Sequence, residues 1–301
     1  MTVIGIDIGY SSSKIMYNNE YFKVPTSISF AHDMGGIDFG ESTIYNFEGE
    51  AYHVGESATD ESFTTTDYTF LYKFAPLIIF HIIKKLNIQG PVEVRTGLAL
   101  SDWTERESFR ERISTININD EILNLTAILV GPQGDGAYRS YITDNNLFDQ
   151  IPETFSVIDI GYRTINFLYY ENGIAHQNKC KGFPGHGVVS IMKTFTNFLE
   201  SEYGMNFSEQ EALKIFLNGS FKIGGVQQTK VPEVINDLKN KFVIKLMNSI
   251  LVSEKKILKL SDYVLITGGG SYLIEDVQMP PNTVWSTNPK EFANVRGYML
   301  V

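Results

Sequence analysis

The chain has 301 residues, of which 43% are hydrophobic and 20% are charged, and its formal net charge is −10 at pH 7. This composition is typical of a folded globular protein, and the length allows one large domain or two ordinary ones. The acidic balance argues against a broad phosphate-binding surface, so no direct contact with nucleic acid is expected. The single cysteine, Cys180, excludes an internal disulfide framework and a cysteine-rich zinc site.

The sequence predicts no contact with a membrane. A strand pattern begins at residue 3, without a preceding basic segment or signal-peptide core. The longest apolar stretch, residues 70–83, is interrupted by Lys73 and His81 and is too short to span a bilayer. We therefore expect a cytoplasmic protein. His81 itself is expected to be a hydrogen-bonded histidine of the core or its boundary rather than a metal ligand.

Predicted strands and helices alternate along the chain. In the first half the predicted elements are strands at 3–8, 14–17, 21–24, 92–100 and 123–130, a loop-rich segment at 31–68, a helix at 71–86, and a charged helix at 103–113 capped by Ser101. In the second half they are strands at 155–160 and 263–267, and helices at 188–203, 208–217 and 232–258. Hairpin turns are expected at Asn18-Asn19 and within Glu171-Asn172-Gly173. The alternation predicts an α/β architecture.

One peptide occurs twice. Residues 3–10 read Val-Ile-Gly-Ile-Asp-Ile-Gly-Tyr, and residues 156–162 read Ser-Val-Ile-Asp-Ile-Gly-Tyr. In each copy a buried strand carries an aspartate, Asp7 or Asp159, to its C-terminal end. A glycine two residues later, Gly9 or Gly161, exposes backbone N–H groups in the turn. Such amides bind phosphate oxygens and such carboxylates hold hydrated Mg²⁺, so each copy is a candidate phosphate and metal site.

The residues that follow each glycine add hydrogen-bond donors and positive charge. They are Tyr10, Ser11, Ser12, Ser13 and Lys14 in the first copy and Tyr162, Arg163 and Thr164 in the second. Two such turns that faced each other would hold phosphate groups from both sides. A single Asp-x-Gly is a weak motif, and two hairpins that carry it by chance are the alternative. Two copies in register, each after a buried strand, favour the phosphate site.

A third motif lies near the C-terminal end. The strand predicted at 263–267 ends in Gly268-Gly269-Gly270, followed by Ser271 and Tyr272. Three glycines leave bare backbone against which a flat ring can lie, and a helix start follows. The alternative is a flexible turn between a strand and a helix.

In this order, the three elements resemble the phosphate-1, phosphate-2 and adenosine motifs of the superfamily of actin, sugar kinases and heat-shock-chaperone ATPases. Asp7-x-Gly9-x4-Lys14 matches phosphate-1, Asp159-x-Gly161-x2-Thr164 resembles phosphate-2, and the glycine triplet resembles the adenosine motif. Within the superfamily the chain is most similar to actin-like proteins of the ParM/StbA type. The segments that carry this similarity are Val24-Pro25-Thr26-Ser27, Gly97-Leu98-Ala99-Leu100-Ser101 and Phe292-Ala293-Asn294-Val295-Arg296-Gly297-Tyr298.

The resemblance implies an actin-like (ribonuclease H-like) fold, in which two related α/β domains surround a nucleotide cleft and each carries a small inserted subdomain. Domain I would comprise residues 1–150, with its small subdomain at about 25–70, and residues 280–301 would return to it. Domain II would comprise residues 151–279, with its small subdomain at about 205–232.

The resemblance also implies site roles, with ATP or GTP and Mg²⁺ as cofactors. Asp7 and Asp159 would hold the metal, and Gln133, just after the strand before phosphate-2, would orient the attacking water, because a glutamine is no base at neutral pH. Alternatively, Gln133 merely ends a strand. Glu211 and Lys214 have the spacing of adenosine-pocket residues, but Ser208-x-x-Glu211 is equally a helix capping box.

The phosphate-2 turn departs from the family at Tyr162-Arg163, where many relatives have small residues. Arg163 would contact phosphate directly or pair with an acidic neighbour, and the sequence leaves both open.

The implied function is that of a nucleotide-dependent ATPase that forms head-to-tail filaments. Its role would be the segregation of plasmid or other extrachromosomal DNA, reached through a DNA-binding adaptor protein on a centromere-like site. The alternative is a small-molecule, sugar-type kinase on the same fold, for which Asp135 is the available base. No convincing sugar-binding Asn-Asp pair follows a predicted strand, which favours the filament protein.

Overall fold

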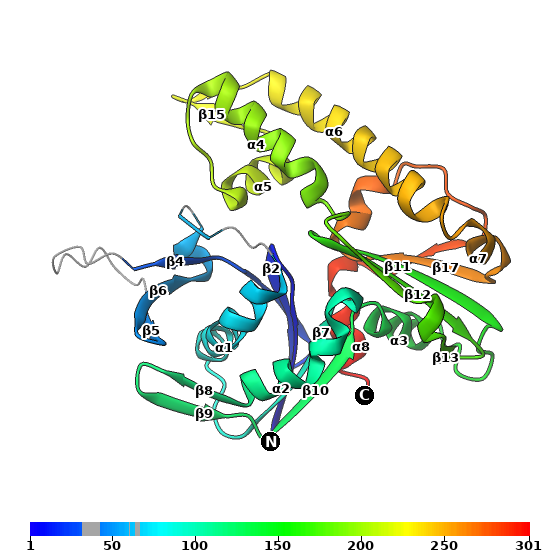
Figure 1. Cartoon of the computed structure of the whole chain (residues 1–301), viewed down its shortest axis with the longest axis horizontal. Helices are drawn as coiled ribbons and strands as arrows, with labels where there is room; N and C mark the ends of the chain where they lie inside the picture. Colours follow the sequence, from blue (N-terminus) through cyan, green and yellow to red (C-terminus); the bar gives the residue numbers. More distant parts are fainter. Residues whose placement is uncertain (32–42, 60, 64–66) are drawn as a thin grey trace.

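The computed structural model describes residues 1–31, 43–59, 61–63 and 67–301. Two sheets lie side by side in the middle of the molecule, and helices cover them (Figure 1). This arrangement confirms the α/β architecture predicted from the sequence.

The first sheet is built around the first copy of the repeated peptide. Its strands run in the order β10 (Ala127–Pro132), β7 (Val92–Leu98), β1 (Thr2–Ile8), β2 (Ser12–Tyr17) and β3 (Glu20–Pro25). β1 and β10 each pair parallel with β7, whereas β2 and β3 form antiparallel hairpins. The Asn18-Asn19 turn is confirmed, with φ values of 51° and 63° that suit asparagine.

Opposite faces of this sheet meet different helices because strand residues alternate in direction. Ile4, Ile6 and Ile8 of β1 belong to the core beneath α1 (Tyr68–Lys85), next to which α2 (Arg106–Ser114) lies. Gly5 points to the other face, where α8 (Ala293–Tyr298) packs, and a Cβ added at Gly5 would lie 2.7 Å from Val295. The first sheet is therefore closed on its second face by the C-terminal end of the chain.

The second sheet repeats this plan around the second copy. Its strands run in the order β13 (Ile174–Ala175), β12 (Thr164–Glu171), β11 (Thr154–Ile160), β17 (Tyr263–Thr267) and β18 (Thr283–Trp285), and β14 (Lys181–Pro184) also pairs with β12. Helices α4 (Val189–Tyr203), α5 (Glu209–Asn218) and α6 (Lys230–Leu246) share a core with one face. Helix α3 (Asp135–Asp144) packs on the other face.

Smaller elements surround the two sheets. They are the sheet of β4 (Ile28–Phe30), β6 (Glu50–Val54) and β5 (Tyr45–Phe47), the hairpin of β8 (Thr115–Ile118) and β9 (Glu121–Asn124), the hairpin of β15 (Lys222–Ile223) and β16 (Val226–Gln227), and α7 (Lys255–Leu260). Short 3-10 helices span Gly55–Ala58, Leu100–Glu105, Gln177–Lys179, Gly269–Ile274 and Lys290–Phe292. Within the small subdomain expected at 25–70, residues 32–42, 60 and 64–66 lie outside the described residues.

Three predicted elements differ in the structure. The strand expected at 123–130 is two strands, β9 and β10, and the charged helix begins only at Arg106, after the 3-10 helix Leu100–Glu105, with no side-chain cap. The helix expected at 232–258 ends as α6, passes through a π-helical turn at Met247–Leu251 and resumes as α7. At this break the hydroxyls of Ser249 and Ser253 donate to carbonyls four residues earlier, a contact that bends helices.

The C-terminal segment is shared between the sheets. Residues 280–301 were expected to return to the first half together. Instead β18 pairs parallel with β17 at the edge of the second sheet, and only the part around α8 packs on the first sheet. The parallel pairing accounts for this difference, because Val264–Ile266 form an open edge that the strand Thr283–Trp285 covers.

Candidate functional site

The two Asp-Ile-Gly-Tyr turns have the same backbone path. In the antiparallel pairing Asp7 lies opposite Lys14, and Asp159 lies opposite Asn166. A Cβ added at Gly9 would lie 2.9 Å from the Ser12 carbonyl oxygen, and one added at Gly161 would lie 2.9 Å from the Thr164 carbonyl oxygen. The sequence repeat is therefore also a structural repeat, in which bare backbone folds closely over itself after each aspartate.

One cavity brings the two turns together. It encloses about 40 Å³ and is lined by Asp7, Gly9, Tyr10, Lys14, Gln133, Asp159, Gly161, Tyr162, Arg163, Thr164, Gly268, Gly269, Glu291 and Asn294. All of these except Glu291 and Asn294 were singled out from the sequence. Residues as far apart in the chain as Gly9 and Gly269 thus face one small space.

The two aspartates of this cavity are almost completely buried. Asp7 is 6% exposed and Asp159 is 5% exposed. Burial raises the pKa of Asp7, and it raises the pKa of Asp159 to about 6, against the hydrogen bond from Asn294. Burial likewise lowers the pKa of the Lys14 ammonium group. Three ionisable groups buried around one cavity favour a ligand that brings charge of its own.

Amide side chains hold both carboxylates in place. The Gln133 Nε2 atom donates to Asp7 Oδ1 at 2.9 Å, and the Asn294 Nδ2 atom donates to Asp159 Oδ2 at 3.0 Å. Asn294 also interacts with Asp7, and Asn166 with Asp159, so amide groups surround both carboxylates, whose oxygen atoms line the cavity. Oxygen ligands of this kind suit Mg²⁺ better than a transition metal. Among the described residues there is no cluster of three or more His, Cys, Asp and Glu side chains that would form a metal cage.

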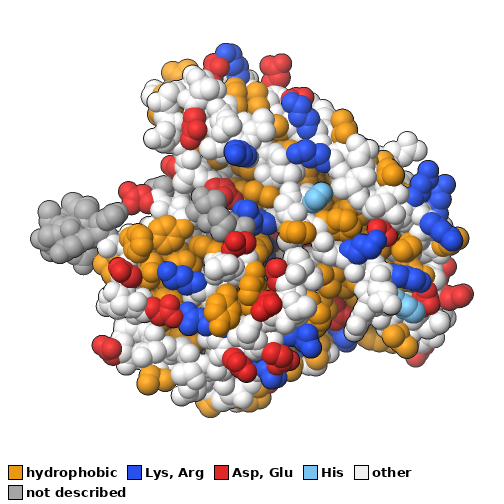
Figure 2. All heavy atoms as spheres, viewed as in Figure 1, with side chains coloured by type: hydrophobic (Ala, Val, Ile, Leu, Met, Phe, Trp, Pro, Cys, Tyr) orange, Lys and Arg blue, Asp and Glu red, His pale blue; other side chains and the backbone are white. Residues whose placement is uncertain are grey.

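A second cavity of about 180 Å³ continues from the first. The two share Lys14, Gly161, Tyr162, Gly269 and Glu291. The second cavity adds Gly270 of the glycine triplet and the polar residues Ser11, Ser12, Lys23 and Tyr272. It also has an apolar wall, formed by Val188, Leu213, Phe216, Leu217 and Leu273. The space-filling view shows that the molecule is hollowed between the part with α4–α6 and the part with β4–β6 (Figure 2). A ligand with an anionic end and a flat apolar end fits this pair of cavities.

Two family models match the chain. Residues 5–136 match the N-terminal domain of actin-like proteins, and residues 157–278 match the C-terminal domain of the archaeal, MreB-like actin homologues. The chain belongs to the actin-like proteins. The two matched ranges correspond to the two structural halves, and each contains one copy of the repeated turn. The family predicted from the sequence is therefore confirmed.

Solved structures agree with this assignment of the fold. The archaeal actin homologue Ta0583 in complex with ADP is 19% identical, covers 99% of this chain and 98% of its own, and superposes with a TM-score of 0.77. The ParM subunit of a 15-stranded filament from Clostridium botulinum is also 19% identical, with the same coverage and a TM-score of 0.78. ParM from Bacillus thuringiensis with AMPPNP is 14% identical and covers 100% of this chain and 98% of its own, with a TM-score of 0.64. A comparison with curated protein sequences found no match.

Three predicted site residues of this actin-like protein lie outside the two cavities. The Glu211 side chain closes a capping box at the start of α5, because its Oε2 atom accepts from the Ser208 N–H at 2.7 Å. Lys214 instead lines an open groove of about 540 Å³ next to the cleft. Ser13 is fully buried and its hydroxyl bonds to that of Thr26 at 3.2 Å. The residues of α5 that face the second cavity are Leu213, Phe216 and Leu217.

Arg163 pairs with an acidic neighbour, which is one of the two alternatives left open by the sequence. One guanidinium nitrogen lies 3.9 Å from Glu209 Oε1 at the start of α5, and the group lies over the Tyr10 ring at 5.7 Å. Tyr162, the other bulky residue of this turn, packs against the cores of both halves. The unusual turn thus contacts both sides of the cleft.

Three residues of the site were not predicted from the sequence: Glu291 and Asn294, which line the first cavity, and Asn166, which forms a side-chain hydrogen bond with Asp159. Asn166 is seven residues after Asp159, as Lys14 is seven residues after Asp7, so extending the comparison of the two copies would have found it. Asn294 was noticed only as part of a segment similar to the family. Nothing local marks it as a partner of Asp159, which is 135 positions away.

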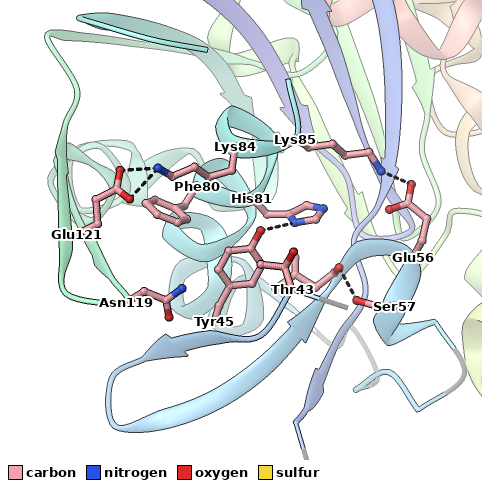
Figure 3. A pocket seen from close by; sticks show the side chains of 11 residues that line it. Thr43, Tyr45, Glu56, Ser57, Phe80, His81, Lys84, Lys85, Asn119 and Glu121 are labelled. Carbon is pink, nitrogen blue, oxygen red and sulfur yellow. Dashed lines mark hydrogen bonds and ion pairs between the residues drawn. The ribbon is translucent and has the colours of Figure 1, made fainter. Parts of the chain in front are cut away.

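A further cavity of about 550 Å³ lies away from the cleft, between α1, β5 and the β8–β9 hairpin (Figure 3). His81 lines it and shares a hydrogen bond between Nδ1 and the Tyr45 hydroxyl at 3.0 Å. Its Nε2 atom is buried and has no hydrogen-bond partner among the described residues. The prediction of a hydrogen-bonded boundary histidine is therefore confirmed for one ring nitrogen only.

His81 is expected to make folding sensitive to mild acid. Burial, with a smaller contribution from Lys85, lowers its pKa to about 4 against the opposing effect of Glu56. Between about pH 6.5 and pH 4 the unfolded state then binds a proton that the folded state rejects, so the free energy of unfolding falls as the pH falls, by at most about 1.4 kcal/mol per pH unit. Denaturant titrations at several pH values should show a shallower fall for His81→Gln, whereas a variant of the exposed His186, His186→Gln, should follow the wild type. Parallel curves for wild type and His81→Gln would contradict the assignment.

No helix within the described residues is both long and apolar enough to cross a membrane.

Proposed function

We propose that this actin-like protein is an ATPase that assembles head to tail into filaments, with hydrolysis weakening the polymer. The observation that supports this most directly is the pair of buried aspartates, Asp7 and Asp159, in two equivalent turns around one cavity, beside a larger cavity with an apolar wall. Among proteins of the same fold, one is a ParM filament subunit and another is a complex with ADP. Subunits that add head to tail without closing into a ring form open filaments.

The residues present fit a magnesium nucleotide. Bare backbone at Gly9 and Gly161 leaves room for phosphate oxygens, Lys14 supplies a counter-charge, and the carboxylates of Asp7 and Asp159 would hold the cation. When bound, ATP would supply the phosphoanhydride bond, and Mg²⁺ would neutralise charge on the transferred phosphoryl group.

The chain's own contribution to hydrolysis is positioning. We propose that Gln133, fixed by its hydrogen bond to Asp7, orients a water molecule, since an uncharged amide cannot remove a proton at neutral pH. Burial of Asp159 strengthens its interaction with any cation bound beside it, because the effective dielectric constant is lower there than in bulk water. The apolar wall of the second cavity and the glycine triplet would hold the nucleobase of the nucleotide. GTP is the alternative to ATP.

The wider assignments are also proposals. We propose domain I at residues 1–150 and domain II at residues 151–279, each with a small subdomain, because each half has its own sheet and core. We propose a role in segregating plasmid or other extrachromosomal DNA in the cytoplasm. An adaptor protein on a centromere-like site would supply the contact with DNA, because a chain of net charge −10 is poorly suited to bind DNA directly.

The test combines light scattering, pelleting and phosphate release on one sample. Mg-ATP should raise the scattering and the pelleted fraction above a critical concentration, and the signal should fall as phosphate is released. Samples with Mg-GTP, with ATP and a chelator, and with no nucleotide serve as controls. A protein that stays monomeric at every concentration but phosphorylates a sugar would replace this proposal with the kinase.

A further inference from the structure

Asn294 is the one side chain of α8 that lines the first cavity, the one of about 40 Å³ between the two turns. It is 6% exposed, and both ends of its amide are used. The Nδ2 atom donates to Asp159 Oδ2 at 3.0 Å, and the Oδ1 atom accepts from the Gly134 N–H at 2.8 Å. A buried amide with donor and acceptor both satisfied holds a single orientation.

These two contacts join groups that lie in different halves of the protein. Gly134 directly follows Gln133, whose Nε2 atom donates to Asp7 Oδ1 at 2.9 Å. Asp159 ends β11 in the second sheet. A continuous path of short contacts therefore runs from Asp7 through the Gln133 loop and Asn294 to Asp159.

The backbone on which Asn294 stands is held by unusually close packing. A Cβ added at Gly136 of α3 would lie 2.3 Å from the Asn294 carbonyl oxygen, and one added at Gly297 of α8 would lie 1.8 Å from the Gly136 carbonyl oxygen. The Arg296 Nε atom also donates to the Ser140 hydroxyl at 3.0 Å. Helices α3 and α8 are thus packed closely along the length of α8, and the Asn294 side chain has little freedom to leave the site.

We propose that Asn294 is a positioning residue for nucleotide hydrolysis, which acts by tying the loop that carries Gln133 to Asp159 across the cleft. This inference rests on the proposed ATPase function. A purely structural role, in which Asn294 only joins α3 to α8, predicts a loss of stability without a specific effect on turnover.

Two variants of Asn294 separate these roles. Asn294→Ala removes both contacts. Asn294→Asp keeps the shape and the acceptor for the Gly134 N–H, but places an oxygen against Asp159 Oδ2 in place of the donor. Ser140→Ala is the matched control, because it removes the contact with Arg296 in the same α3–α8 packing and touches neither carboxylate.

The experiment measures kcat and KM for ATP and the melting temperature of each variant, alone and combined with Gln133→Ala. Asn294→Asp should lower kcat by about 10- to 100-fold, with a much smaller change in KM, when both are measured well below its melting temperature, which the added buried carboxylate is expected to lower. Because Asn294 acts through Gln133, adding Asn294→Asp to Gln133→Ala should lower kcat by less than about threefold more.

Two results would overturn the inference alone: wild-type turnover in Asn294→Asp, or losses in the double variant that multiply as for independent sites. If Asn294→Ala does not fold, the turnover of Asn294→Asp alone distinguishes the positioning role from the structural role. A wild type that binds ATP and hydrolyses none would overturn the proposed ATPase and this inference together, so the two failures are distinguishable.

Discussion

Replacing Asp159 with asparagine is expected to lower phosphate release by about a thousandfold, the scale seen when a single electrostatic group of an active site is removed. The change removes one charge and keeps the shape, so Asn294 can keep its hydrogen bond if the new amide turns its oxygen toward Asn294 Nδ2. If Asp159 holds the cation, no other described carboxylate in the cavity except Asp7 and Glu291 can take its place.

The same variant should be at least as stable as the wild type without nucleotide. Burial raises the pKa of Asp159 to about 6, so the folded state holds this proton more tightly than the unfolded state does. The burial of the charged form therefore costs stability as the pH rises through about 6. Asp159→Asn avoids that cost at pH 7.5, and the difference from wild type should shrink at pH 4.

Phosphate release under single-turnover conditions and denaturant unfolding at both pH values test this prediction. Asp237→Asn, which neutralises an exposed aspartate paired with Lys241, should hydrolyse ATP like the wild type. Undiminished turnover in Asp159→Asn would mean that another carboxylate holds the metal.

Local sequence patterns predicted the parts of the site that depend on a strand and the turn after it. Asp7, Gly9, Asp159 and Gly161 were found in this way, because an apolar run that ends in Asp-x-Gly has few other stable forms than a buried strand with an exposed turn. The same two strands, β1 and β11, are the ones around which the two sheets are built. Their parallel pairing with β7 and β17 agrees with the alternation of strands and helices along the chain.

The parts of the fold and of the site that were not predicted from the sequence depend on contacts between residues far apart in the chain. Helix α3 starts at Asp135, within residues 131–136, whose three glycines favour a loop. Gly136 is needed there because its bare backbone allows α8 to pack closely on α3. Asn294 reaches Asp159 only because α8 lies across the end of α3. Glu211 had two equally good local interpretations, and the structure shows the capping box while the adenosine-pocket role stays a prediction.

The α3–α8 packing should therefore be the most sensitive point of the fold to a small substitution. A Cβ added at Gly297 would lie 1.8 Å from the Gly136 carbonyl oxygen and 2.5 Å from its Cα, and backbone atoms of a packed helix cannot rotate away as a side chain can. Gly297→Ala must push α8 off α3, and we expect a loss of about 3 kcal/mol in the free energy of unfolding, at the upper end for overpacking. Gly131→Ala is the matched control, because its nearest atoms belong to Tyr298 at 3.6 Å, an ordinary contact.

Denaturant unfolding of both variants tests the prediction, and equal midpoints would contradict it. The effect should also reach the cleft, since Asn294 stands on the same helix as Gly297 and contacts Asp159 and the Gly134 N–H from there. A displaced α8 would carry the Asn294 amide away from both partners at once. Gly297→Ala is therefore expected to lose hydrolysis at temperatures where most of the protein is still folded, whereas Gly131→Ala should lose it only as it unfolds.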